Sequence, residues 1–96
     1  MELVNSAKIS GKVVKIYQLQ QTLSGLPVFS FLLEHVSNQI EAGNSRVAKC
    51  QVYCIVVNNK DILAQNLLDC SVVVSGFLSQ NSKQQLVLNV QNVIAD

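Results

Sequence analysis

Tryptophan is missing from this chain, and proline, histidine and glycine are scarce: its 96 residues include one proline, one histidine and four glycines. Charged residues make up only 14% and aromatic residues 5%. The 49% of hydrophobic residues excludes a disordered chain. We predict one globular domain spanning residues 1–96, with enough excess apolar surface to suggest a partner subunit. The net charge of +1 neither demands nor excludes nucleic acid as a ligand.

Cysteine is present but shows no framework spacing, since its three copies stand at positions 50, 54 and 70. An odd, irregular set predicts reduced thiols in a cytosol. The N-terminus has no basic region followed by an apolar run, so no signal peptide is expected. The longest apolar run, Val52–Val57, is far too short to span a membrane.

A first strand with one wet face is predicted from Ala7, because apolar and polar residues alternate as far as Val13. The alternation then slips by one residue, and Val14 and Ile16 become the apolar members. A slip just after Gly11 indicates a bulge that bends the strand.

Four more strands follow by the same period-two rule, over about 28–37, 46–57 and 71–79 and from Leu86. The second and third form a long hairpin that is expected to turn in a polar loop at Asn44-Ser45. Residues 58–68 have weak helical spacing and predict a short helical turn or an irregular connector. Five strands with one such break predict a small all-β barrel.

The long hairpin carries a spaced motif that resembles one known family, the primosomal replication protein N (PriB) family, relatives of bacterial single-stranded DNA-binding protein. Its residues are Leu33-Glu34-His35, Ser37, Gln39, Glu41-Ala42-Gly43, Arg46 and Cys50-Gln51. The resemblance extends from Ser10-Gly11 to the last strand. It implies a five-stranded OB-fold barrel, a homodimer and no enzymatic activity.

The same resemblance implies the biological setting. A PriB-like protein binds single-stranded DNA, supports the PriA helicase at stalled replication forks and hands over to a downstream primosome loading factor. It needs no cofactor or metal, and it works in the bacterial cytoplasm at the nucleoid. Its dimer interface is expected along the first strand, at Lys8, Ile9, Ser10, Gly11 and Lys12.

Candidate DNA contacts follow from the groove of an OB-fold, which lies over the first three strands and their loops. The candidates are Lys12, Lys15, Asn44, Arg46, Lys49, Tyr53 and Lys83. Tyr53, with Tyr17 near the bulge, supplies the candidate stacking rings. The alternative is that the lysines only solubilise the surface.

Three positions depart from the family pattern. The family often has aromatic residues at the positions of Asn44 and Lys49, and an arginine at that of Val36. Stacking groups are therefore scarce, and we expect weak, strongly salt-dependent binding carried mainly by phosphate neutralisation, with Lys49 as the most valuable contact.

Three other functions remain open. The first is a protein-interaction adaptor of the same fold with little DNA binding. The second is a general single-stranded DNA-binding protein, but the sequence stops at Asp96 with no flexible acidic tail, which counts against it. The third is a small hydrolase with a His35–Cys50 pair. His35 shares parity with the apolar residues of its strand, so a hydrogen-bonded structural histidine is the favoured interpretation. Buried thiols are favoured over a zinc site for Cys50 and Cys54.

Overall fold

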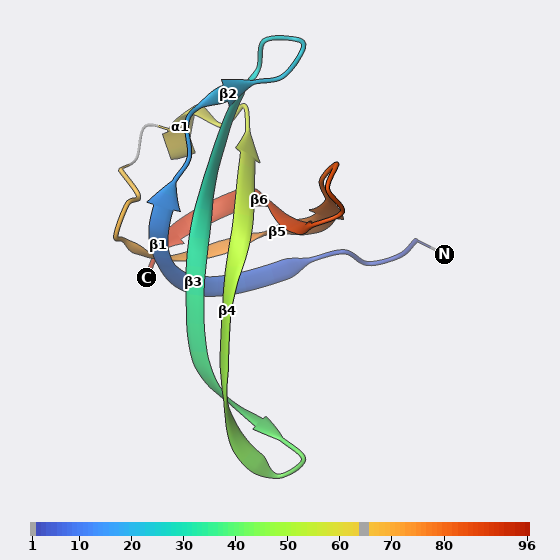
Figure 1. Cartoon of the computed structure of the whole chain (residues 1–96), viewed down its shortest axis with the longest axis vertical. Helices are drawn as coiled ribbons and strands as arrows, with labels where there is room; N and C mark the ends of the chain where they lie inside the picture. Colours follow the sequence, from blue (N-terminus) through green and yellow to red (C-terminus); the bar gives the residue numbers. More distant parts are fainter. Residues whose placement is uncertain (1, 64–65) are drawn as a thin grey trace.

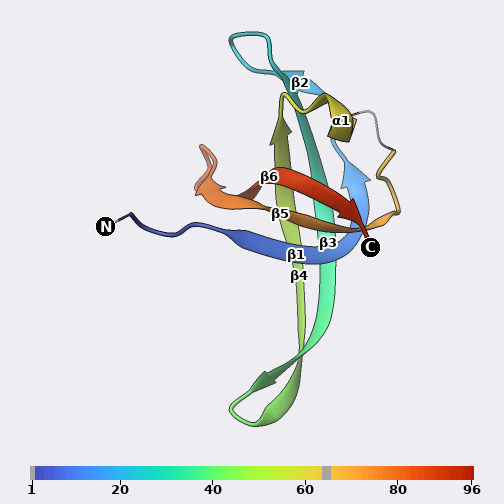
Figure 2. The same cartoon turned by 180° about the vertical axis from the view of Figure 1, so that it is seen from behind.

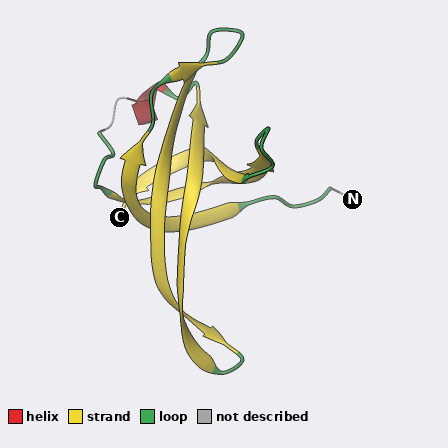
Figure 3. Ribbon diagram, viewed as in Figure 1, coloured by secondary structure: helices red, strands yellow, loops and turns green. Residues whose placement is uncertain are grey.

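The computed structural model describes residues 2–63 and 66–96, and almost all of its regular structure is β-strand (Figure 3). The strands are β1 (Ala7–Ile16), β2 (Gln20–Gln21), β3 (Pro27–Glu41), β4 (Asn44–Val57), β5 (Ser71–Gln80) and β6 (Leu86–Ala95). A single turn of helix, α1 (Lys60–Leu63), lies in the connector. The all-β prediction is confirmed, with β2 as an added two-residue strand that pairs with the start of β3.

The strands close into a barrel in the order β1-β5-β6-β4-β3, and β3 pairs back to β1. Four of the five contacts are antiparallel. The fifth, between β4 and β6, is parallel and has only two register pairs, Cys54↔Leu88 and Ile55↔Asn89. Figure 1 shows β3 and β4 upright, with β1, β5 and β6 running across them. This is the five-stranded OB-fold that the family resemblance implied.

A bulge bends β1 where the alternation slips. Val13 lies opposite Leu33, but Lys15 lies opposite Leu32, so Val14 is the extra residue. The predicted bulge is confirmed. Shortly before the bulge, β1 approaches β3 so closely that only glycine fits at position 11. A Cβ on Gly11 would overlap the carbonyl oxygen of Glu34.

The core fills the barrel with aliphatic side chains and two phenylalanines, Phe29 and Phe31. Every barrel strand contributes, and the connector adds Ile62 and Leu67 at 4% and 3% exposure. Asn59 Oδ1 accepts a hydrogen bond from the Ile62 backbone N–H at 3.1 Å and so starts the helical turn. The fully buried side chains are Phe31, Leu33, Leu88, Val13, Val56, Val72, Val74 and Cys54.

β3 and β4 continue far beyond the barrel as a two-stranded hairpin, visible from both sides in Figures 1 and 2. We call residues 35–50 the distal ribbon. Its turn is formed by Ala42 and Gly43, which have φ values of 52° and 80°. The expected loop at Asn44-Ser45 is wrong, because both residues already belong to β4 and pair with Glu41 and Ile40.

Candidate nucleic-acid interface

The β3–β4 hairpin has one face toward the core and one toward solvent. Phe31, Leu33 and Cys54 are buried, so their neighbours in sequence point outward. Residues directly opposite in an antiparallel pair share a face, and the register therefore builds this outer face from Leu32–Tyr53, Glu34–Gln51 and Val36–Lys49. Lys49 and Tyr53 lie on it together, as the sequence predicted.

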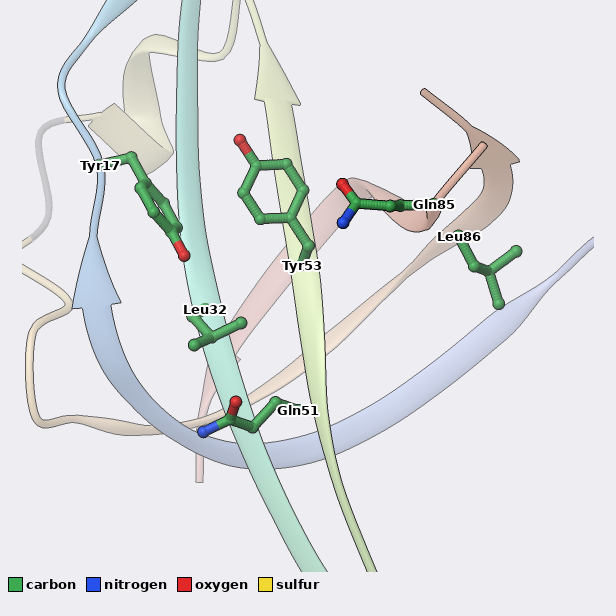
Figure 4. A pocket seen from close by; sticks show the side chains of 6 residues that line it. All are labelled: Tyr17, Leu32, Gln51, Tyr53, Gln85 and Leu86. Carbon is green, nitrogen blue, oxygen red and sulfur yellow. The ribbon is translucent and has the colours of Figure 1, made fainter. Parts of the chain in front are cut away.

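A cleft of about 460 Å³ opens on the outer face. Its floor comes from β3 and β4, Tyr17 follows β1, and the β5–β6 turn closes the other side (Figure 4). The Tyr17 and Tyr53 ring centroids are 5.3 Å apart with an interplanar angle of 62°. The lining residues are Tyr17, Leu32, Gln51, Tyr53, Gln85 and Leu86.

Sequence reasoning identified the two tyrosines of this cleft and missed its other four residues. For two of them a signal existed, since Leu32 and Gln51 have the parity of Tyr53 once β3 and β4 are paired. Gln85 and Leu86 come from a hairpin distant in sequence, so only the closed barrel brings them to the tyrosines.

Three of the predicted lysines lie on the segments that form this cleft or its face. The Nζ of Lys15 lies 5.0 Å from the centroid of the Tyr17 ring, a cation–π contact. Lys49 is exposed two residues beyond Gln51. Lys83 lies in the turn that supplies Gln85, where its backbone N–H donates to Asn81 Oδ1 at 3.0 Å. Lys12 is also exposed, but its register partner is the acidic Glu34.

Arg46 and Asn44 do not join this group. Arg46 lies opposite Gln39, which places it on the other face of the distal ribbon from Lys49, and it forms a salt bridge with Glu41. Asn44 lies beside the turn, opposite Glu41. The register thus separates two of the candidate DNA contacts, Arg46 and Lys49, onto opposite faces of the distal ribbon.

His35 is held by two hydrogen bonds, as the structural interpretation predicted. Its Nδ1 lies 2.7 Å from the Ser10 carbonyl oxygen and its Nε2 lies 2.7 Å from Ser37 Oγ. A carbonyl only accepts, so Nδ1 carries a proton and donates. Gln39 Nε2 donates to the same hydroxyl at 2.9 Å. Both ring nitrogens are bonded to serine atoms rather than to Cys50, which lies opposite on β4, so the His35–Cys50 pair of the hydrolase alternative is not formed.

The cysteines behave differently from one another. Cys54 is buried, and burial raises the pKa of its thiol to about 12. Cys50 and Cys70 are exposed, so the expectation of a buried thiol is wrong for Cys50. Within the described ranges, no group of three or more His, Cys, Asp or Glu side chains is arranged to hold a metal ion.

The first strand has a free edge where the dimer interface was expected. β1 pairs with β5 from Ala7 to Lys12, whereas its pairing with β3 begins only at Lys12. Among the described residues, the second edge of β1 therefore has no strand partner from Ala7 to Gly11. No helix in the described ranges has the length and apolar character needed to cross a membrane.

Comparison with known proteins assigns the family. Residues 5–92 match a family described as another single-strand binding protein family. The replication restart protein PriB of Vibrio cholerae is 34% identical over 97 residues, which cover 95% of this chain and 97% of that protein. The chain belongs to the PriB family of single-strand binding proteins.

Solved structures agree on the fold. PriB from Ralstonia solanacearum superimposes with a TM-score of 0.86 at 17% identity, covering 97% of this chain and 98% of that one. The dimeric N-terminal domain of PriB from Thermoanaerobacter tencongensis superimposes with a TM-score of 0.70 at 20% identity, covering 96% of each chain.

Proposed function

We propose that this chain is a non-enzymatic, single-stranded DNA-binding protein of replication restart. Membership of the PriB family supports the biological role. The outer face of β3 and β4 gives the main structural support for DNA binding. It holds a cleft with two tyrosines, and Lys15, Lys49 and Lys83 lie on the segments around it. Cations neutralise phosphates while aromatic rings receive bases.

A direct test is fluorescence anisotropy with labelled single- and double-stranded oligonucleotides of equal length at two salt concentrations. We expect the single strand to bind more tightly, because its unpaired bases reach the tyrosines. Affinity should fall steeply as salt rises, since phosphate neutralisation releases counterions. Preference for the duplex, or an affinity that salt hardly changes, would contradict the proposal.

We infer a homodimer formed by pairing of two β1 strands along the free edge from Ala7 to Gly11. The support is that unpaired edge and the dimeric PriB domain of the same fold. The Ser10 carbonyl oxygen points to this edge, because it accepts a hydrogen bond from His35 there. In an extended strand the N–H and C=O of one residue point to the same side, so the Ser10 N–H also points to this edge.

Light scattering tests this interface. The expected mass is about twice the 10.5 kDa of one chain at micromolar concentration. Ser10→Pro removes one edge donor without removing a donor to β5, so this variant should shift toward monomer while its circular dichroism remains that of a folded β-protein. A monomeric wild-type protein would refute the dimer.

Membership of the family supports a proposal for the remaining partners. We propose that the protein holds the strand in its groove while another surface contacts the PriA helicase, and that it then gives way to a downstream primosome loading factor. We place this work in the bacterial cytoplasm at the nucleoid. The test is helicase unwinding of a forked substrate with and without the protein, and no stimulation would contradict it.

A second candidate function is a protein-interaction adaptor with little DNA binding. It is favoured by three apolar side chains on the outer face of the distal ribbon, Val36, Ile40 and Val47, which are 58%, 75% and 62% exposed. Asn44→Phe separates the two functions. A ribbon that reaches DNA should gain up to one stacking contact, about 1–3 kcal/mol. Unchanged affinity with persisting helicase stimulation would favour the adaptor.

A further inference from the structure

The turn that joins β2 to β3 exposes apolar side chains at the end of the molecule opposite the distal ribbon. Figures 1 and 2 both show this turn at one end of the long axis and the Ala42-Gly43 turn at the other. Leu23 at its apex is fully exposed, and Leu19 and Leu26 of the same hairpin are 55% and 39% exposed. We call residues 19–26 the leucine turn. The proposed DNA contacts leave its three leucines without a role.

Hydrogen bonds fix the shape of the leucine turn. The Gly25 N–H donates to the Thr22 carbonyl oxygen at 2.9 Å, which closes a β-turn with Leu23 at its apex. The Thr22 N–H donates to the Leu26 carbonyl oxygen at 2.8 Å, and the Leu26 N–H donates to Thr22 Oγ1 at 3.1 Å. Leu23 is thus held outward before any partner arrives, so its docking costs little backbone entropy.

The segment around the leucine turn offers no charge to a phosphate. Residues 16–33 include no Lys, Arg, Asp or Glu. At the end of β4, Val57 lies opposite Val28 and adds a further exposed apolar side chain. The cores of protein–protein interfaces are depleted of charged residues, whereas nucleic-acid sites gain their affinity from Lys and Arg. The leucine turn therefore has the composition of a protein contact rather than of a DNA contact.

Composition also separates a protein partner from a lipid surface. Segments that bind membrane interfaces combine apolar residues with Lys or Arg and with Trp or Phe. Residues 18–28 contain none of these four types. A second copy of this chain is already placed elsewhere, at the free edge of β1. An uncharged groove on a different protein is the occupant that this surface fits.

We propose that the leucine turn docks into an apolar groove of the PriA helicase, with Leu23 as its central contact. The inference rests on the proposed function and deepens it, because it names the surface that holds the helicase. The molecule extends 49 Å along its longest axis, with the leucine turn and the distal ribbon at opposite ends. One chain can therefore hold the helicase at one end while a DNA strand lies across the ribbon and the cleft.

Helicase binding tests the contact directly. Labelled Leu23→Ser protein is titrated with purified helicase in the absence of DNA, beside the wild type and the matched control Leu3→Ser, which makes the same change at a 93% exposed leucine ahead of β1. Loss of a leucine that the complex buries should weaken binding about 10- to 150-fold. The control should bind as the wild type does. Because Leu23 is fully exposed in the free chain, Leu23→Ser should keep the wild-type midpoint of thermal unfolding.

DNA affinity is the second readout. Leu23→Ser should bind a single-stranded oligonucleotide as tightly as the wild type, and an equal loss of affinity for DNA and for helicase would overturn the inference. Ile40→Ser tests the rival apolar surface on the distal ribbon. Loss of helicase binding in Ile40→Ser, with Leu23→Ser unaffected, would also overturn it.

The other occupants are tested with the same variant. Binding of the wild type to vesicles of phosphatidylcholine and phosphatidylglycerol that Leu23→Ser abolishes would overturn the inference. So would a mass above that of a dimer in light scattering that Leu23→Ser lowers. If the wild-type protein does not bind the helicase, the proposed partnership itself fails. If the wild type binds it and Leu23→Ser binds equally tightly, only the leucine turn is refuted.

Discussion

Reversal of charge at Lys49 is the sharpest test of the DNA-binding face. Lys49 is exposed, opposite Val36 on the distal ribbon, and four residues from Tyr53 along β4. At about 3.3 Å per residue this is roughly 13 Å between the two Cα atoms. A strand whose base stacks on Tyr53 therefore passes its neighbouring phosphates near Lys49.

The expected loss of DNA affinity is modest because Lys49 is exposed to water. A phosphate about 4 Å from an ammonium group in water gains about 1 kcal/mol. Lys49→Glu replaces that attraction by repulsion, a change of about 2 kcal/mol, or roughly 30-fold in affinity at low salt. Screening at physiological ionic strength, where the Debye length is about 8 Å, reduces this to about 5- to 10-fold.

Lys60→Glu is the matched control. It changes the net charge by the same two units, from +1 to −1, but at the start of α1 in the connector. Both lysines are exposed, so the free energy of unfolding should change by no more than about 0.5 kcal/mol in either variant. Anisotropy titrations at several salt concentrations compare the two. Equal losses of affinity would show that only net charge matters and would refute the assignment of Lys49 to the groove.

Two further predictions concern the barrel itself. Gly76→Ala should destabilise the fold by more than about 2 kcal/mol, because a Cβ there overlaps the Asn89 carbonyl oxygen, and a denaturant midpoint equal to that of the wild type would contradict this. A thiol reagent at pH 8 should modify two cysteines quickly in the native protein, Cys50 and Cys70, and Cys54 only after unfolding. Since burial raises the Cys54 pKa from 9.0 to about 12, the unfolded state ionises first, and thermal stability should fall between those pH values in wild type but less in Cys54→Ala.

The architecture was predictable where one local rule decided the outcome. The slip of alternation after Val13 located the bulge in β1, since side-chain parity reports directly on pairing. The parity of His35 predicted a bonded histidine, and its partner proved to be the Ser10 carbonyl. The closure of β4 on β6 was expected only from the family resemblance, because a two-pair parallel contact leaves no pattern in the sequence.

The predictions that the structure contradicts failed for equally specific reasons. The turn was placed at Asn44-Ser45 because those residues favour turns, whereas the chain turns at Ala42-Gly43 with Ala42 at positive φ, an unusual conformation for alanine. That shift of two residues also lengthens β4. The salt bridge to Glu41 then occupies Arg46 on the face away from Lys49. Cys50 continues the apolar parity of β4, but the distal ribbon has already left the barrel there, so its inward face meets solvent.

The distal ribbon also has a consequence for backbone protection. From His35 outward, β3 and β4 have only each other as strand partners among the described residues, and a two-stranded ribbon is marginally stable by itself. Its amides should exchange with solvent by fraying from the Ala42-Gly43 turn, with protection rising toward His35, where the bond to Ser10 ties the ribbon to β1. A DNA strand lying across Lys49 would slow exchange in the ribbon, and a strand that continues into the tyrosine cleft would also slow it in the β5–β6 turn. Hydrogen exchange thus provides a label-free map of where the ligand lies.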